Sequence, residues 1–479
     1  MLYPMSVIRT ACCVASAALI VGLTPGAALA QQTSADAYYE FLMARRLETA
    51  GNAAGALAAL ERAAAADPKS AEIKAEIAAF HFRRTPPQRV EGEKAAKEAL
   101  ALDVNNVEAN RSLGFLYANT VDVNARNLSP QMLQDAKDAV VHLERAVAGS
   151  PGVDAQMQYT LGRLYISTGD WQKAAQALTR VVAQNPNNPQ ALQSLAEAFA
   201  AGGDLKGAIR TLEEVVEYVP RVAVALATYQ VRAGLLKEAA ESYTIALSAQ
   251  PNSRELKVQR IAALYNAKEF TQAAAFAGEA RKQHPEDQNF ARLQARALFD
   301  AGDRSGAIAV AEASAKAFPR DIQTRWVLAD LYAEAGRSGD RERLLRQILA
   351  DAPSDARALN ELGYLLATRG EQLDEAITLV RRALDSEPNN GAYLDSLGWA
   401  YFRRGDLAEA QKYLAAAAER MPASSEVLDH LGDVHERRGE LPQAIDAWTR
   451  ALAGDGRGIE RPAVEQKIGN ARVKMQNAK

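Results

Sequence analysis

The chain has 479 residues, with 56 Lys and Arg against 59 Asp and Glu and a formal net charge of −3 at pH 7. A charge this close to balance excludes a strong electrostatic attraction to nucleic acid or to an anionic membrane. Both cysteines, Cys12 and Cys13, fall within residues 1–30, so the rest of the chain has no thiol for a disulfide or a thiolate metal site.

Residues 1–30 have the pattern of a secretory signal peptide. Arg9 precedes an apolar run from 11 to 23, and Ala28-Leu29-Ala30 supplies the small residues of a cleavage site. The run is shorter than the roughly 20 apolar residues of a membrane-spanning helix, although a retained inner-membrane anchor stays an alternative. We expect cleavage after Ala30, secretion across the inner membrane of a bacterium, a periplasmic location and no stable membrane insertion.

Residues 31–453 repeat with a regular period. Proline cannot continue a helix, so a proline at a fixed interval marks the end of a recurring helical unit. The interval is about 34 residues, which is typical of stacked helical hairpins and predicts an all-α fold of about twelve helix–turn–helix units. The prolines that carry it are Pro68, Pro151, Pro186, Pro220, Pro251, Pro285, Pro319, Pro353, Pro388 and Pro422.

Each unit repeats the same residue types between its prolines. A Leu–Gly pair such as Leu397-Gly398 stands upstream of a small residue such as Ala410, which lets two helices approach closely. Gly405-Asp406 is an example of the inner turn, in which glycine ends one helix and aspartate caps the next. Apolar residues inside a unit follow the three- and four-residue spacing of a helix and never the alternation of a strand.

The period is broken in two places. The units within 72–151 are irregular and contain an insertion after Tyr117, and Ser129-Pro130 is predicted to begin the helix that follows it. The unit near 221–251 is shortened, which predicts a local bend. Insertions in repeat arrays gather on one face, often a working one, and a tolerated surface loop is the alternative for this one.

The last segment, 454–479, reads as a linker followed by a capping helix. Gly454, Gly456 and Gly458 interrupt the helical pattern, and Val464 and Ile468 then lie on one face of a helix. A terminal helix of this kind covers the apolar edge of the last repeat in a stacked array.

No catalytic, metal-binding or cofactor-binding motif is evident. The sequence has no phosphate-binding loop, no nucleophile elbow and no zinc-binding histidine pair. The histidines are scattered over separate units, and we expect each to be a partly exposed helix residue; they are His81, His142, His284, His430 and His435. We therefore expect no catalysis, no metal and no cofactor.

The repeated pattern resembles the tetratricopeptide repeat family. Thr160-Leu161-Gly162-Arg163-Leu164-Tyr165 is one clear stretch, and another runs from Leu394 through Leu397-Gly398-Trp399 to Tyr401. The resemblance covers almost the whole of 35–453 and implies a right-handed α-solenoid. In this family the first helices of successive units line a concave groove that receives a peptide or a helix of a partner protein.

The resemblance also implies which side chains face the groove, counted from the Leu–Gly pair of each unit. The candidate groove residues are Arg292, Arg296, Trp326, Asp330, Asn360, Tyr364, Asp395, Trp399, Asp429 and Asp433. We expect them to form a basic patch followed by an aromatic and acidic strip, which suits a partner with apolar anchors and Lys or Arg. For Trp326 and Trp399, packing between neighbouring helices is the alternative.

The sequence therefore predicts a non-catalytic periplasmic scaffold or adaptor that holds one or more envelope proteins or peptide segments. Leu362-Gly363-Tyr364 and Leu397-Gly398-Trp399 resemble units of bacterial envelope repeat proteins. Some of those deliver substrates to a protease, and others serve exopolysaccharide export. A self-assembling structural protein, and hence a homo-oligomer, is the remaining alternative.

Overall fold

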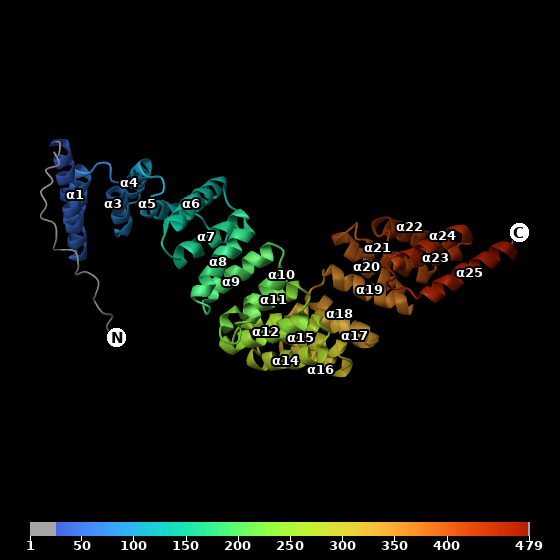
Figure 1. Cartoon of the computed structure of the whole chain (residues 1–479). Coiled ribbons are helices and arrows are strands. Elements are labelled where there is room, and N and C mark those ends of the chain that lie inside the picture. The colour runs from blue at the N-terminus through green and yellow to red at the C-terminus, as the bar shows by residue number, and fades with distance from the viewer. Residues whose placement is uncertain (1–24, 126, 478–479) are drawn as a thin grey trace. The chain divides into compact units, whose positions relative to one another are not determined.

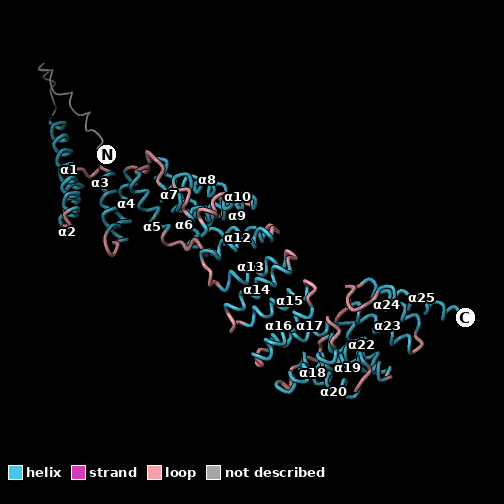
Figure 2. The backbone as a smooth tube through the Cα atoms, turned by 90° about the horizontal axis from the view of Figure 1, so that it is seen from below, coloured by secondary structure: helices cyan, strands magenta, loops and turns pink. Residues whose placement is uncertain are grey.

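The computed structural model of the chain describes residues 25–125 and 127–477. Within these residues the chain forms helices and a single short 3-10 turn, with no strand, so the predicted all-α class is confirmed (Figure 2). Most of the predicted signal peptide, residues 1–24, lies outside the described residues. None of the helices in the described part combines the length and the apolar content that a membrane crossing requires.

The contacts divide the chain into two compact units, which meet in sequence after Pro251. The elements of the first unit (Figure 1) are α1 (Pro25–Thr49), α2 (Ala53–Ala66), α3 (Ala71–Arg83), α4 (Arg89–Leu102), α5 (Val107–Ala118), α6 (Pro130–Gly149), α7 (Ala155–Thr168), α8 (Trp171–Gln184), α9 (Pro189–Ala201), α10 (Leu205–Glu213), the 3-10 turn η1 (Pro220–Val222), α11 (Ala223–Arg232) and α12 (Leu236–Ala249).

The second unit has the same plan and ends in an additional helix. Its elements are α13 (Arg254–Asn266), α14 (Phe270–Gln283), α15 (Gln288–Asp300), α16 (Arg304–Ala317), α17 (Ile322–Glu334), α18 (Ser338–Asp351), α19 (Ala356–Arg369), α20 (Leu373–Ser386), α21 (Gly391–Arg404), α22 (Leu407–Arg420), α23 (Ser425–Arg437), α24 (Leu441–Ala453) and α25 (Arg461–Asn477). Helices α1 to α24 pair as consecutive hairpins, from α1 with α2 to α23 with α24.

The recurring small residues explain how the hairpins close. A methyl group on Gly398 of α21 would lie 2.6 Å from Cγ of Leu414 of α22, closer than real side chains approach. The turn between these helices needs glycine for a different reason, because Gly405 has a φ of 97°, in the left-handed region. The Leu–Gly pair and the Gly–Asp turn therefore specify the hairpin at two independent points.

The two irregular stretches are visible in the helix boundaries. Residues 119–129 join α5 to α6, and the Ser129 side chain accepts a hydrogen bond from the backbone N–H of Met132 to cap α6. Within 221–251 the first helix, α11, has only 10 residues, whereas the second, α12, has 14. The shortened repeat is thus the last one before the division between the two units.

Helix α25 packs against α24 at the end of the second unit. Val464, Ile468 and Ala471 form a buried cluster with Ala444 and Trp448 of α24. The apolar side of α24 is therefore covered by the chain itself, and the charged residues of α25 become available to the helices beside it.

Candidate functional site

The candidate groove residues all lie on the first helices of consecutive hairpins in the second unit. Arg292 and Arg296 are on α15, and the other pairs follow on α17, α19, α21 and α23. Several of these first helices pack directly on one another, as α15 does on α17 and α21 does on both α19 and α23. We call these residues, together with the side chains bonded to them, the candidate surface. Its role as a groove stays a prediction.

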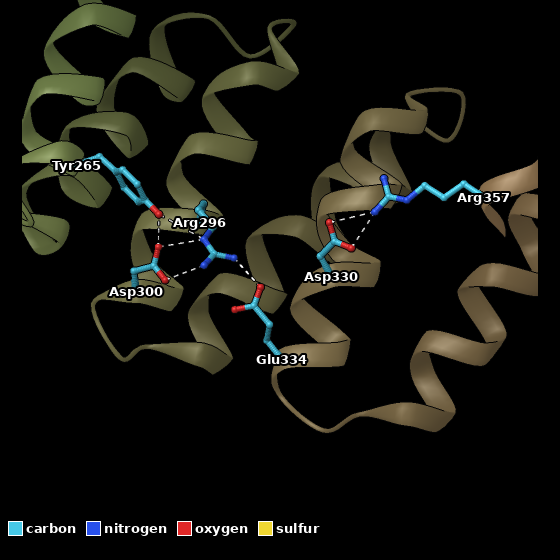
Figure 3. Close-up of polar contacts among 6 residues, drawn as sticks. All are labelled: Tyr265, Arg296, Asp300, Asp330, Glu334 and Arg357. Carbon is cyan, nitrogen blue, oxygen red and sulfur yellow. Dashed lines mark hydrogen bonds and ion pairs between the residues drawn. The ribbon is translucent and has the colours of Figure 1, made fainter. Parts of the chain in front are cut away.

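The arginines of α15 are held in ion pairs that span two repeats. Arg292 donates to Oδ2 of Asp321 at 2.7 Å. Arg296 donates to Asp300 at 3.0 Å and to Glu334 of α17 at 2.6 Å, and the Tyr265 hydroxyl also bonds to Asp300 (Figure 3). Burial opposes the charge of Arg296, but these carboxylates raise its pKa above the ordinary arginine value. Neither arginine is free to give the surface a net positive charge.

The next helix pair, α17 and α19, is joined by a stacked arginine. The Arg357 guanidinium lies 3.9 Å from the ring centre of Trp326. It also donates to Oδ1 of Asp330 at 3.1 Å (Figure 3). Trp326 is only 8% exposed. Here both predicted residues are engaged by an arginine that the repeat pattern did not indicate.

At the other end of the unit, helix α25 supplies the cation for the last repeat. Lys467 Nζ donates to Oδ1 of Asp429 at 2.9 Å and to Oδ1 of Asp433 at 2.6 Å. Burial raises the pKa of Asp433, and Lys467 acts against that rise. Asp433 also accepts a hydrogen bond of 3.2 Å from the indole N–H of Trp448. The helix predicted to cap the array thus also neutralises two of the predicted acidic residues.

These pairs correct the expected charge pattern. A separate basic patch followed by an acidic strip is wrong, because the arginines of α15 and the aspartates of α17 and α23 each have an opposite charge from a neighbouring helix. Groove positions counted from the Leu–Gly pair depend on the sequence of one repeat at a time. Such a count therefore does not detect an oppositely charged side chain in the next repeat.

The region where α19, α21 and α23 meet is built differently, around a buried histidine. Asp395 and His430 are 6% and 8% exposed, and Nδ1 of His430 lies 2.9 Å from Oδ1 of Asp395. Burial alone would lower the pKa of His430, but the Asp395 carboxylate raises it above the ordinary histidine value. The expectation of a partly exposed helix residue is therefore wrong for His430, because an aspartate one repeat earlier stabilises it inside the protein. It is also wrong for His81, which is 8% exposed.

Aromatic rings surround this histidine. The Trp399 ring stacks on His430 with 4.0 Å between ring centres, and on Phe402 with 5.1 Å. The Tyr364 ring centre is 6.5 Å from that of His430, and its hydroxyl donates to Oε1 of Glu426 at 2.5 Å. Burial and the nearby carboxylate both raise the pKa of Tyr364 above its ordinary value. Trp399 thus packs between helices and remains partly exposed.

Two polar atoms of the same region have no hydrogen-bond partner. Oδ1 of Asn360 on α19 and Nε1 of Trp399 on α21 are both buried and unpaired. Unpaired buried polar atoms are uncommon in folded proteins and cost free energy. The first is an acceptor and the second a donor, so a bound segment or water molecules could satisfy both.

Sequence reasoning missed the side chains that are bonded to the predicted residues, among them Arg357, Glu426, His430 and Lys467. A usable signal existed for Lys467, because α25 follows the last hairpin in the position that a further first helix would take. Across 25–125 and 127–477, no group of three or more His, Cys, Asp or Glu side chains is placed to hold a metal ion.

The sequence profile of the tetratricopeptide repeat matches residues 159–221, 224–288, 259–322, 292–340, 327–391 and 396–458, which together make up more than half of the chain. The chain is 34% identical over 128 residues to TPR repeat-containing protein PA4667 of Pseudomonas aeruginosa, covering 27% of this chain and 22% of that protein. It is 26% identical over 325 residues to cellulose synthase operon protein C of Xanthomonas axonopodis pv. citri, covering 64% of this chain and 20% of that protein.

A shorter relative, TPR repeat-containing protein PA0015 of Pseudomonas aeruginosa, is 38% identical over 73 residues, which is 15% of this chain and 68% of that protein. The matched part is thus about a fifth of the length of the two longer relatives. Among solved structures, a chain of Naa15/Naa10 bound to HypK-THB aligns over 92% of this chain and 73% of its own length, with a TM-score of 0.45 and 17% identity. Yeast Tom70 aligns over 92% and 96%, with a TM-score of 0.39 and 14% identity.

Proposed function

Because this chain belongs to the tetratricopeptide repeat family, we propose that it is a non-catalytic scaffold that holds partner proteins on the first helices of its C-terminal repeats. The observation that carries this proposal is the region where α19, α21 and α23 meet. It combines partly exposed aromatic rings, Tyr364 and Trp399, with unpaired polar atoms on a rigid set of helices.

The physical case for binding rests on preorganisation. Asp395 and Trp399 are held by His430, and Tyr364 is held by Glu426, so few side chains would have to be ordered when a partner docks. Binding then loses little conformational entropy, and a few aromatic anchors can supply most of the affinity.

We place this scaffold in the bacterial envelope. The pattern of residues 1–30 supports secretion, and similarity over 64% of the chain to a protein named for the cellulose synthase operon supports a role near the cell surface. The partner on this account is an envelope protein, or a peptide segment of one, in the periplasm.

A second candidate function is narrower. The same similarity favours an accessory role in exopolysaccharide export, in which the repeats hold parts of an export machine together. This differs from the general adaptor only in the identity of the partner, so one experiment addresses both.

The test is site-specific photocrosslinking in intact cells. A photoreactive phenylalanine derivative replaces Tyr364 in one strain and Glu419, an exposed residue of α22, in the other. We expect a reproducible envelope-protein adduct from position 364 and none from position 419. An export protein in the adduct would select the second candidate. Adducts only with another copy of this chain, or equal adducts from both positions, would contradict the proposed function.

A further inference from the structure

The carboxylates of the candidate surface are nearly all matched by a permanent cation. Asp300 and Glu334 bond to Arg296, Asp321 bonds to Arg292, Asp330 bonds to Arg357, and Asp429 and Asp433 bond to Lys467. Each cation comes from the same helix as its carboxylate or from a helix beside it, so the chain itself supplies the cations that bond to these carboxylates.

Glu426 is the clearest exception. Among the described residues its only bonded partner is the hydroxyl of Tyr364, which is neutral. Asp395 is the other exception, since its partner is His430 and not an arginine or lysine. The two carboxylates lie on α23 and α21. Asp395 bonds to His430 itself, and Glu426 bonds to Tyr364, whose ring lies near that histidine. These two carboxylates therefore have no bonded arginine or lysine, and together they exceed the single positive charge that a protonated His430 supplies.

Two further features of α19 and α21 favour a positive charge, whereas the unpaired Nε1–H of Trp399 needs an acceptor. Oδ1 of Asn360, which is 9% exposed, is an acceptor without a donor. The faces of the Tyr364 and Trp399 rings carry the negative side of the aromatic quadrupole, which attracts cations. An anionic ligand would instead meet the carboxylates of Glu426 and Asp395.

From this mismatch we infer that the place where α19, α21 and α23 meet receives an arginine or lysine side chain of a partner protein, which bonds to Glu426 and lies against Tyr364 and Trp399. The inference rests on the proposed function and specifies the chemistry of its partner. A similar arrangement already exists within the second unit. There Arg357 of α19 bonds to Asp330 and stacks on Trp326, and both of these residues are on α17.

The incoming cation would compete with the Tyr364 hydroxyl for Glu426. The Tyr364 hydroxyl is a neutral donor, so a guanidinium or ammonium group, which adds Coulomb attraction to the hydrogen bond, has the advantage. Arg403 lies 5.9 Å from the Trp399 ring centre but bonds to the carbonyl oxygen of Thr368, and Arg437 lies 5.6 Å from the ring centre of Phe402. Glu426 is only partly buried, so an outside group can approach it.

The experiment uses the whole chain and a positional-scanning library of hexapeptides, read out by fluorescence polarisation. We expect the library to select Arg or Lys next to an apolar residue. In the best single peptide, replacing Arg by citrulline, its neutral isostere, should weaken binding about tenfold. Glu426→Gln should cause the same loss and remove the preference for Arg over citrulline, and Glu419→Gln is the matched control that should change nothing.

A second variant still tests the proposed cation site if Glu426→Gln is poorly folded. Tyr364→Phe removes the competing hydroxyl and frees Glu426, so binding of the Arg peptide should be retained or strengthened, while a purely structural role for the contact would weaken it. Peptide binding that ignores the citrulline replacement would overturn the cation site and leave the proposed function standing. Failure of every peptide in the library to bind would count against both.

Discussion

Tyr364 of α19 donates a 2.5 Å hydrogen bond to Glu426 of α23, and α21 lies between these two helices in the sequence. The contact joins the first helices of two hairpins that are separated by one other hairpin. Side chains from three consecutive repeats therefore come together beside α21. Asp395, Trp399 and His430 belong to the same group. The last three complete repeats therefore act as one structural site, and the predictions below address its parts.

The first prediction concerns the histidine in this site. The pKa of His430 is raised in the folded protein, so its protonated form stabilises the fold at pH values below about 6.5, the ordinary histidine pKa. That stabilisation is lost as the pH rises through the folded-state pKa. We expect hydrogen exchange in α23, taken relative to the intrinsic amide rate at each pH, to accelerate over that rise in the original chain. In Asp395→Asn the acceleration should be much smaller, and an identical pH profile in both proteins would show that the pair is not the cause.

The second prediction concerns the cation supplied by α25. Lys467→Met leaves Asp429 and Asp433 without their shared partner, and should destabilise the packing of α25 by about 1–3 kcal/mol. Limited trypsin digestion should then cut faster at Arg457, in the segment that leads into α25. Lys474→Met is the matched control, because Lys474 pairs with Glu436 in a more exposed position. Equal cutting of the two variants would mean that apolar contacts alone hold α25.

The third prediction separates the two uses of glycine in one hairpin. Gly398→Ala forces a methyl group against Leu414 and should destabilise the hairpin of α21 and α22 by about 1–3 kcal/mol. Gly405→Ala meets no atom within 4 Å, but it places a side chain in the left-handed region, at a cost of about 1 kcal/mol. Hydrogen exchange of the two helices measures both effects. A larger effect at Gly405 would show that the turn, and not the close approach, limits the hairpin.

The fourth prediction tests the proposed location. A reporter enzyme that needs disulfide bonds to fold, fused after Lys479, should be active in bacteria only when residues 1–30 are present. Deleting 1–30 should leave the fusion protein intact but inactive. Activity of the deleted form at the original level would contradict secretion by this segment.

The fold was predictable because its signals are local. Pro422, Gly405 and the Leu397-Gly398 pair each act within one hairpin, and their regular recurrence specifies the next hairpin in turn. The all-α class and the hairpin order follow from these residues alone. The division after Pro251 was not predicted, since the shortened repeat before it indicated only a local bend.

The contacts of the candidate surface were less predictable because they cross repeats at variable offsets. Arg296 reaches forward to Glu334, whereas Arg357 reaches back to Asp330. An arginine side chain is long enough to reach a carboxylate of either the preceding or the following repeat. The backbone period is the same in both cases, so the rotamer of the side chain determines which carboxylate it bonds. The burial of His430 depends likewise on Asp395 of the preceding repeat.

The central claim is that partners dock on the first helices of the C-terminal repeats. Its most direct test is hydrogen exchange of the full chain, alone and with the envelope protein identified by crosslinking at position 364. The account predicts slower exchange on binding in α19, α21 and α23, and little change in α20, α22 and α24. Protection confined to those second helices, or to the first unit, would contradict it.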